Sequence, residues 1–193
     1  MAHDNMTPSD WVRRWTPLIP RDGQVLDLAC GHGRHLRWLA SCGLSVLGVD
    51  RDSAALASAA AWGNTLPADL EQGPWPLAGR TFAGVVVTHY LWRPTWSLLL
   101  DCLAPGGVLI YETFSRQQAQ IGKPSRDDFL LQPGELLQRC SGLRVVAYED
   151  GFLSHPDRFI QRIAAVREIS PPRVNDALPA LVRMSISPSS CST

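Results

Sequence analysis

Three residues near position 30 have the types and the spacing of a nucleotide-binding turn. Asp27 lies inside a short apolar run, and Gly31 and Gly33 follow it just before a helical pattern. Glycine has no Cβ atom, so a ligand can approach the backbone closely at such a turn. The backbone N–H groups at the start of the helix could also face an anionic group such as a carboxylate. The pattern therefore predicts a ligand site at the carboxyl end of a buried strand.

A second acid supports this interpretation. Asp50 ends the next apolar run, and an acid at that spacing can accept hydrogen bonds from both hydroxyl groups of a ribose. The dinucleotide fingerprint Gly-x-Gly-x-x-Gly would need a glycine at position 36, where this chain has Leu36. This difference argues against a nicotinamide-dependent oxidoreductase. We therefore predict a ligand that contains a nucleoside but is not a nicotinamide dinucleotide.

The Asp-x-x-x-Gly-x-Gly pattern of this turn resembles the first motif of class I S-adenosylmethionine (SAM)-dependent methyltransferases. Residues 104–110, Ala-Pro-Gly-Gly-Val-Leu-Ile, look like the hallmark of that family before its fifth strand. The resemblance implies SAM as the cofactor and S-adenosylhomocysteine as its product. It places Asp69 at the adenine amino group and Leu70 against the adenine ring. The cofactor contacts that it implies are Asp27, Ala29, Gly31, Gly33, Asp50, Arg51, Asp69, Leu70 and Thr88.

Three further segments resemble a smaller group within this family. Residues 88–94, 111–114 and 129–137 look like a bacterial group that is often labelled tellurite-resistance-type methyltransferases. Its members commonly have Asn where this chain has His89, so a role based on that amide does not carry over. The chain also lacks Asn-Pro-Pro-Tyr or Asp-Pro-Pro-Tyr after the fourth strand. Exocyclic amino groups of nucleobases, and main-chain or side-chain amides, are therefore less expected as methyl acceptors. The resemblance identifies the cofactor and leaves the acceptor unidentified.

The chemistry of the cofactor limits what the protein must supply. The sulfonium of SAM is already an activated methyl donor, so the enzyme must align the acceptor and exclude water. A general base is needed only if the acceptor carries a proton at the working pH. The candidates for that base are His89, Tyr90 and Glu112. For His89, contact with cofactor or substrate is the favoured role. Tyr90 could instead pack or contact the substrate, and Glu112 could hold the polar segment or the neighbouring strand.

Several cations lie in or near a long polar segment, residues 115–128, which could fold over the acceptor site. Arg93 and Arg126, together with Arg116 and Lys123, suggest a small anionic acceptor, because arginine binds carboxylates and oxyanions through paired hydrogen bonds. The predicted substrate contacts are therefore Tyr90, Arg93 and Arg126. The alternative is that these cations are solvated, or are paired with Asp127, Asp128 and Glu112.

The leading hypothesis is an enzyme that transfers a methyl group from SAM to an unidentified small-molecule acceptor by direct in-line displacement. The alternative is a SAM-binding regulatory or partner-dependent protein without independent catalysis. His32 and His35 are three residues apart and could meet on one helix face. No nearby Cys, Asp or Glu completes a ligand set with them, so no metal site is expected.

The order of the apolar runs predicts an α/β protein. Strands are expected at residues 25–29, 45–49, 65–70, 82–88, 107–113, 143–150 and 159–167, with helices between most of them. The last two strands are joined by a turn that is too short for a crossover helix, so they should pair antiparallel. We expect a Rossmann-like sheet of seven strands in the order 3-2-1-4-5-7-6, with the last strand antiparallel and helices on both faces.

Length and composition are ordinary for one globular domain. The chain has 193 residues, with 18 basic and 18 acidic side chains, so a broad basic surface for nucleic acid is not expected. Residues 1–169 are expected to form the methyltransferase domain, with a loose start at 1–6 and a poorly ordered, serine-rich tail at 170–193. No apolar run approaches the length of a membrane helix, and the first residues lack a signal-peptide pattern. Five scattered cysteines, four expected in the core and Cys191 in the tail, suggest reduced thiols in a cytoplasmic protein.

Overall fold

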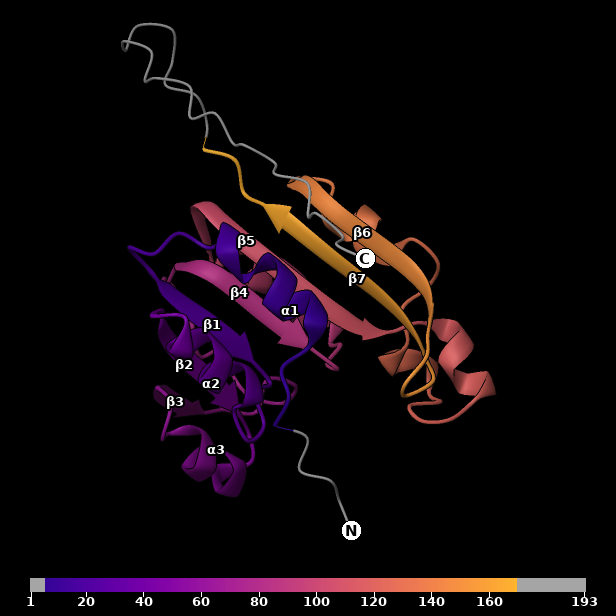
Figure 1. Cartoon of the computed structure of the whole chain (residues 1–193), viewed down its shortest axis with the longest axis horizontal. Coiled ribbons are helices and arrows are strands. Elements are labelled where there is room, and N and C mark those ends of the chain that lie inside the picture. Colours follow the sequence, from indigo (N-terminus) through magenta and orange to yellow (C-terminus); the bar gives the residue numbers. More distant parts are fainter. Residues whose placement is uncertain (1–5, 170–193) are drawn as a thin grey trace, which may run out of the picture.

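Seven strands form one sheet in the order β3-β2-β1-β4-β5-β7-β6, in a computed structural model that describes residues 6–169 (Figure 1). Strands β1 to β5 pair in parallel, and β7 runs antiparallel to both β5 and β6. The predicted order and directions are therefore confirmed. The strands are β1 (Gln24–Leu28), β2 (Ser45–Asp50), β3 (Asn64–Pro67), β4 (Phe82–Thr88), β5 (Leu103–Phe114), β6 (Arg144–Leu153) and β7 (Arg158–Val166).

The central strands are the continuous apolar runs of the sequence. Every residue of β4 is buried, and β1 lies between β2 and β4. Most strand bounds differ by a residue or so from those expected, and β6 extends to Leu153 rather than 150. Two other differences bear on the site and on the β4–β5 pairing. Strand β3 ends at Pro67, so Asp69 lies in the loop after it. Strand β5 begins at Leu103, because Leu103 pairs with Phe82 before a register shift in the β4–β5 ladder.

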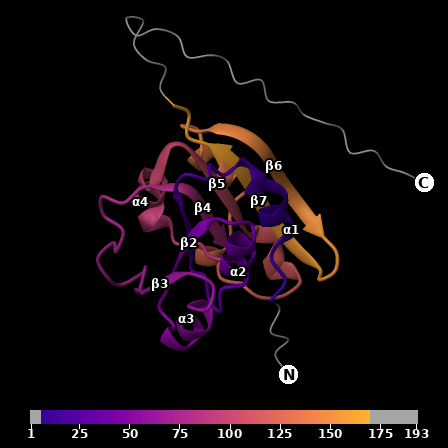
Figure 2. The same ribbon diagram turned by 60° about the vertical axis from the view of Figure 1, so that its left-hand side comes forward.

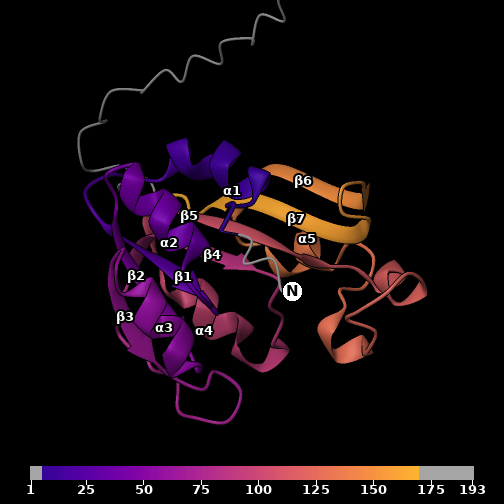
Figure 3. The same ribbon diagram turned by 60° about the horizontal axis from the view of Figure 1, so that its bottom comes forward.

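Helices cover both faces of the sheet, as predicted (Figure 3). They are α1 (Asp10–Trp15), α2 (Arg34–Ser41), α3 (Ser53–Ala59), α4 (Trp96–Asp101) and α5 (Glu135–Arg139). One core cluster joins α1, α2 and α3 to one face, through residues such as Trp11, Leu36 and Leu56. The other cluster joins α4 and α5 to the opposite face, through Trp96 and Leu136. Helix α4 is short, because Arg93–Thr95 form a 3-10 turn before it.

The polar segment after β5 is held against β7 rather than left open. It contains two 3-10 turns, Arg116–Gln120 and Asp127–Phe129. The buried Gln118 accepts a hydrogen bond from the backbone N–H of Phe159 at 2.9 Å and donates one to the carbonyl of Lys123 at 3.1 Å. These bonds place the segment beside the start of β7.

The β6–β7 hairpin forms one edge of the sheet, and β3 forms the other (Figure 2). Because β6 runs parallel to β1–β5, the turn that joins it to β7 lies at the same end of the sheet as the carboxyl ends of those strands. The turn contains His155, Pro156 and Asp157. This edge therefore brings a distant part of the chain to the predicted ligand site.

Some expectations fall on other parts of the chain. Residues 1–5 and the expected tail at 170–193, with Cys191, lie outside the described residues. Of the other cysteines, Cys30, Cys102 and Cys140 are buried free thiols, whereas Cys42 is half-buried and packs against the edge of a core cluster. No helix in residues 6–169 has the length and apolar character needed to cross a membrane.

Candidate functional site

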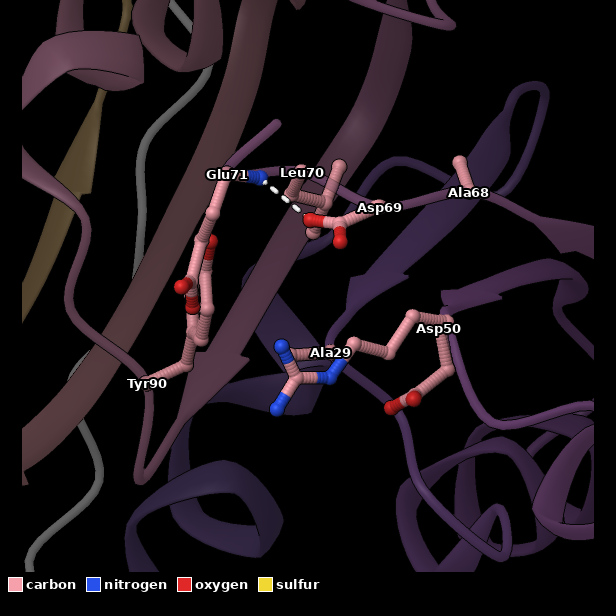
Figure 4. Close-up of a pocket in the computed structure, with 8 residues that line it drawn as sticks. Ala29, Asp50, Ala68, Asp69, Leu70, Glu71 and Tyr90 are labelled. Atoms are coloured by element: carbon pink, nitrogen blue, oxygen red, sulfur yellow. Dashed lines mark hydrogen bonds between the residues drawn. The ribbon is translucent and has the colours of Figure 1, made fainter. Parts of the chain in front are cut away.

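Three neighbouring cavities lie around the carboxyl ends of β1, β2 and β4. We name each after one residue. The Asp50 cavity, of about 180 Å³, is lined by Ala29, Asp50, Arg51, Ala68, Asp69, Leu70, Glu71 and Tyr90 (Figure 4). The Gly31 cavity, of about 260 Å³, is lined by Met6, Ala29, Cys30, Gly31, His32, Arg34, His35, Thr88 and His89. The His89 cavity, of about 370 Å³, is lined by residues 7–10, 112, 114, 118, 123 and 155–158 together with Arg34 and His89.

The cavities share residues and so form a row. Ala29 lines both the Asp50 and the Gly31 cavity, while Arg34 and His89 line both the Gly31 and the His89 cavity. A ligand of nucleoside length could therefore occupy the first two cavities, with one end at His89.

The end of β2 positions Asp50. Its Oδ2 accepts a hydrogen bond from the backbone N–H of Gly31 at 2.8 Å, and its Oδ1 accepts one from the N–H of Asp52 at 3.0 Å. Each carboxylate oxygen can accept a second hydrogen bond. Asp50 is half-buried, so its carboxylate is fixed by the turn and still faces the cavity (Figure 4).

The loop after β3 supplies the opposite wall of the Asp50 cavity. Asp69 Oδ1 accepts hydrogen bonds from the backbone N–H groups of Glu71 at 2.8 Å and Gln72 at 3.2 Å. Its Oδ2 has no partner among residues 6–169 and remains able to accept one. Leu70 is 7% exposed and belongs to the core as well as to the cavity wall. The structure thus brings Asp50, Arg51, Asp69 and Leu70 together, as the sequence predicted.

The two glycines of the turn, Gly31 and Gly33, have different structural roles. Gly31 has a φ of +52°, and a Cβ placed on it would meet no atom within 4 Å, so its open side faces the Gly31 cavity. Gly33 has a φ of +81°, and its Cβ would lie 2.8 Å from the Cβ of Ala59 on α3. Gly33 lines none of the three cavities, and the structure shows it as a close contact between α2 and α3.

Asp27 also lies behind the cavities rather than in their walls. It is 1% exposed, and its Oδ2 has no hydrogen-bond partner among the described residues. Burial raises its pKa to about 8, while Arg34 opposes and Asp50 adds to this shift. Asp27 therefore supports the turn from beneath, and the predicted direct contact with the cofactor is not what this geometry shows.

His35 and Thr88 hold the floor of the Gly31 cavity. His35 Nε2 accepts a hydrogen bond from the backbone N–H of Ser9 at 3.2 Å, so its proton lies on Nδ1, which is 3.4 Å from Thr88 Oγ1. Burial, followed by the charges of Arg34 and His89, lowers the pKa of His35 to about 3. No group of three or more potential metal ligands occurs in residues 6–169, and His35 is a neutral structural side chain.

His89 stands where the Gly31 cavity meets the His89 cavity. Its φ of +54° turns the side chain away from β4, and its ring stacks on Phe114 with centroids 4.9 Å apart. Its Nδ1 lies 3.4 Å from Nη2 of Arg34. Desolvation, followed by the charges of Arg34 and Arg158, lowers the pKa of His89 to about 4, so the ring is neutral near pH 7.

Glu112 is fixed by two partners at the base of the His89 cavity. The hydroxyl of Ser9 donates to Oε1 at 3.0 Å, and Nη1 of Arg162 on β7 donates to Oε2 at 3.3 Å. Glu112 is 1% exposed. Of the roles left open by the sequence, the structure favours the one in which Glu112 holds the neighbouring strand.

Tyr90 lies in a different place from the predicted acceptor contact. It lines the Asp50 cavity and not the His89 cavity. Its hydroxyl is buried with no hydrogen-bond partner in residues 6–169, and burial raises its pKa above the usual value for tyrosine. Tyr90 is therefore a poor candidate for a general base.

Two predicted substrate contacts are paired elsewhere. Arg93 binds Glu135 through Nε and Nη2, both at 2.8 Å, and donates to the carbonyls of Asp128 and Leu130. Arg126 is exposed and pairs with Asp128 at 2.8 Å. Neither lines the His89 cavity, and the structure pairs both with acidic side chains. Glu135 and Asp128 neutralise them, which is close to the alternative stated from the sequence.

The residues that sequence reasoning missed come from three separated segments. Residues 7–10 and 155–158 line the His89 cavity, and Arg34 lies between two cavities. Arg34 directly follows the glycine turn, which was a usable signal. The 155–158 turn could have been placed at the carboxyl edge from the predicted strand order, although the identity of its lining residues could not.

Part of the chain matches a known protein family. Residues 25–107 match a family model described as "Methyltransferase domain". No curated protein sequence gives a match. The matched segment contains the glycine turn, Asp50, Asp69 and His89.

Solved structures share the fold at low sequence identity. TehB from Haemophilus influenzae superposes with a TM-score of 0.69 at 18% identity, covering 86% of this chain and 64% of that chain. A TehB-like SAM-dependent methyltransferase from Corynebacterium glutamicum gives 0.60 at 17% identity, covering 82% and 87%. The glycopeptide N-methyltransferase MtfA, in complex with S-adenosylhomocysteine, gives 0.58 at 17% identity, covering 82% and 88%. This chain thus spans less than two thirds of the TehB chain.

Residues 25–107 are thus similar to a methyltransferase domain, and the described part of the chain has a fold similar to that of TehB-like proteins.

Proposed function

We propose that this protein transfers a methyl group from SAM to a small-molecule acceptor by direct in-line displacement. The observation that carries the proposal is the row of cavities, in which a nucleoside-sized site ends at His89 and a separate cavity begins there. SAM supplies a methyl group on a positively charged sulfur, which is already activated for transfer.

The residues present fit this cofactor. Asp50 would accept hydrogen bonds from the ribose hydroxyls, and Asp69 with Leu70 would receive the adenine. The open side of Gly31 leaves room for the methionine end, and Arg34 offers guanidinium N–H groups for its carboxylate. Arg34 has no carboxylate partner within 4.0 Å among residues 6–169.

The chain's own contribution is alignment and exclusion of water. Phe114 holds the ring of His89 in one plane, and residues 6–10 form one wall of the Gly31 and His89 cavities. Neither Glu112, with both oxygens engaged, nor Tyr90, with its raised pKa, is ready to take a proton. This favours an acceptor that is already deprotonated or that needs no base.

The second cavity favours transfer over simple cofactor binding. A SAM-binding regulatory protein needs the Asp50 and Gly31 cavities alone, whereas an enzyme needs space for an acceptor beside the reacting end. The His89 cavity, of about 370 Å³, supplies that space.

Methyl-labelled SAM and a panel of thiols, phenols and carboxylates test the proposal. The wild-type protein should label at least one acceptor and release S-adenosylhomocysteine, while Asp50→Ala at the same SAM concentration should be slower. Tight binding of SAM with no transfer across the whole panel would favour the regulatory alternative.

A further inference from the structure

The walls of the His89 cavity carry an excess of unpaired positive charge. Arg34, Lys123 and Arg158 line it, and none of the three has a carboxylate within 4.0 Å among the described residues. Arg34 and Arg158 are half-buried, so their charges are only partly solvated. The Nε of Arg158 is buried with no hydrogen-bond partner in that part of the chain. Burying such a donor without an acceptor is unfavourable, and a bound anion would remove the cost.

Three acids also line the cavity, but two of them are occupied. Glu112 is paired with Arg162 at 3.3 Å, in a group that also contains Glu149 and Arg14 and so holds two acids and two arginines. Asp10 lies 3.5 Å from Arg13. Asp157 is exposed and makes no ion pair in residues 6–169. With Arg34 assigned to the methionine carboxylate, one free acid faces two free cations, Lys123 and Arg158, and the cavity keeps a net positive charge.

His89 adds a neutral donor to this surface. The guanidinium of Arg34 can only donate, so Nδ1 of His89 must be the acceptor in their 3.4 Å contact. The neutral ring then carries its proton on Nε2, which is a donor and not a base. The stacking of the ring on Phe114 fixes the plane in which that donor lies.

We propose that the His89 cavity binds an acceptor that carries a carboxylate or another oxyanion, held by Arg158 and by the Nε2–H of His89. Lys123 at the rim adds long-range attraction, and Arg34 divides its donors between the cofactor end and this cavity. This inference rests on the proposed function, because it makes the anion part of the methyl acceptor. Its residues differ from those that the sequence suggested, since Arg93 and Arg126 are already paired.

The test is a titration of the full chain, saturated with S-adenosylhomocysteine, with inorganic phosphate and separately with acetate, followed by calorimetry. Saturation keeps the anions out of the cofactor end. We expect at least one anion to bind with a Kd on the order of millimolar, and Arg158→Gln to raise that Kd about tenfold or more. Preferential binding of acetate would indicate a carboxylate acceptor, and preferential binding of phosphate a tetrahedral oxyanion.

Control variants make the result specific. Arg144→Gln removes an exposed arginine at the opposite end of the β6–β7 hairpin and should leave the anion Kd unchanged. Arg158→Lys should bind the anion more tightly than Arg158→Gln, because it keeps the positive charge. Lys123→Gln changes an exposed residue and should also raise the anion Kd, so it tests the inference if Arg158→Gln does not fold. Equal anion affinity in the wild type, Arg158→Gln and Lys123→Gln, or no binding of either anion, would overturn the inference. Loss of S-adenosylhomocysteine binding by the wild type would instead count against the proposed function.

Discussion

The two glycines of the turn should fail in different ways when each is replaced by alanine. At Gly33 the left-handed backbone costs a residue with a Cβ about 1–2 kcal/mol. The new methyl group would also lie 2.8 Å from the Cβ and 2.9 Å from the Cα of Ala59, so α2 and α3 must shift. Such overpacking adds about 1–3 kcal/mol. We expect Gly33→Ala to lower the free energy of unfolding by about 2–5 kcal/mol.

Gly31→Ala is the matched control, because its backbone is also left-handed but its Cβ would meet no atom within 4 Å. It should lower the free energy of unfolding by only the cost of the left-handed backbone, about 1–2 kcal/mol. Its methyl group would instead enter the Gly31 cavity and weaken binding of S-adenosylhomocysteine. Urea denaturation and calorimetry on both variants provide the assay. If Gly33→Ala loses no more stability than Gly31→Ala, the reasoning about the α2–α3 contact is refuted.

Two further predictions concern Glu135 and Tyr90. Burial raises the pKa of Glu135, but hydrogen bonds from Arg93, the Gln132 N–H and Arg139 lower it to about 2, from 4.5. A lowered folded-state pKa stabilises the protein above pH 4.5, and this stabilisation, about 3 kcal/mol, is lost as the pH falls toward 2. Urea denaturation from pH 6 to 2 should show a flatter decline for Glu135→Gln, and parallel curves would contradict this. Tyr90→Phe removes a buried hydroxyl without a partner in residues 6–169, so stability and kcat should stay close to wild type; a large fall in kcat would restore Tyr90 as a base.

The sequence predicted the parts of the site that lie close to regular elements. Asp50 ends a strand of uninterrupted apolar residues, and Asp69 follows the next strand, so their meeting at one edge follows from the strand order alone. The seven strands and their order could be predicted because the central runs are apolar throughout and the last two segments are joined by a short turn.

The acceptor side could not be predicted in the same way. Whether Arg93 faces a ligand depends on Glu135, which is 42 residues away and approaches through α5. Arg158 reaches the cavity from a turn whose sequence resembles any polar hairpin. Gly33 shows the same limit, since the spacing that matches a ligand motif also suits a close contact with Ala59, and only the position of α3 decides between them.

Calorimetric titration of S-adenosylhomocysteine into the wild-type protein and Asp50→Ala tests the central claim most directly. Loss of the shared acceptor for two ribose hydroxyls should cost roughly 1–3 kcal/mol, so the variant should bind about tenfold more weakly or worse. Asp10→Ala, an exposed acid outside the Asp50 and Gly31 cavities, should bind S-adenosylhomocysteine as the wild type does. The same affinity for the wild type and Asp50→Ala, or no binding to either, would contradict the assignment of these cavities to the cofactor.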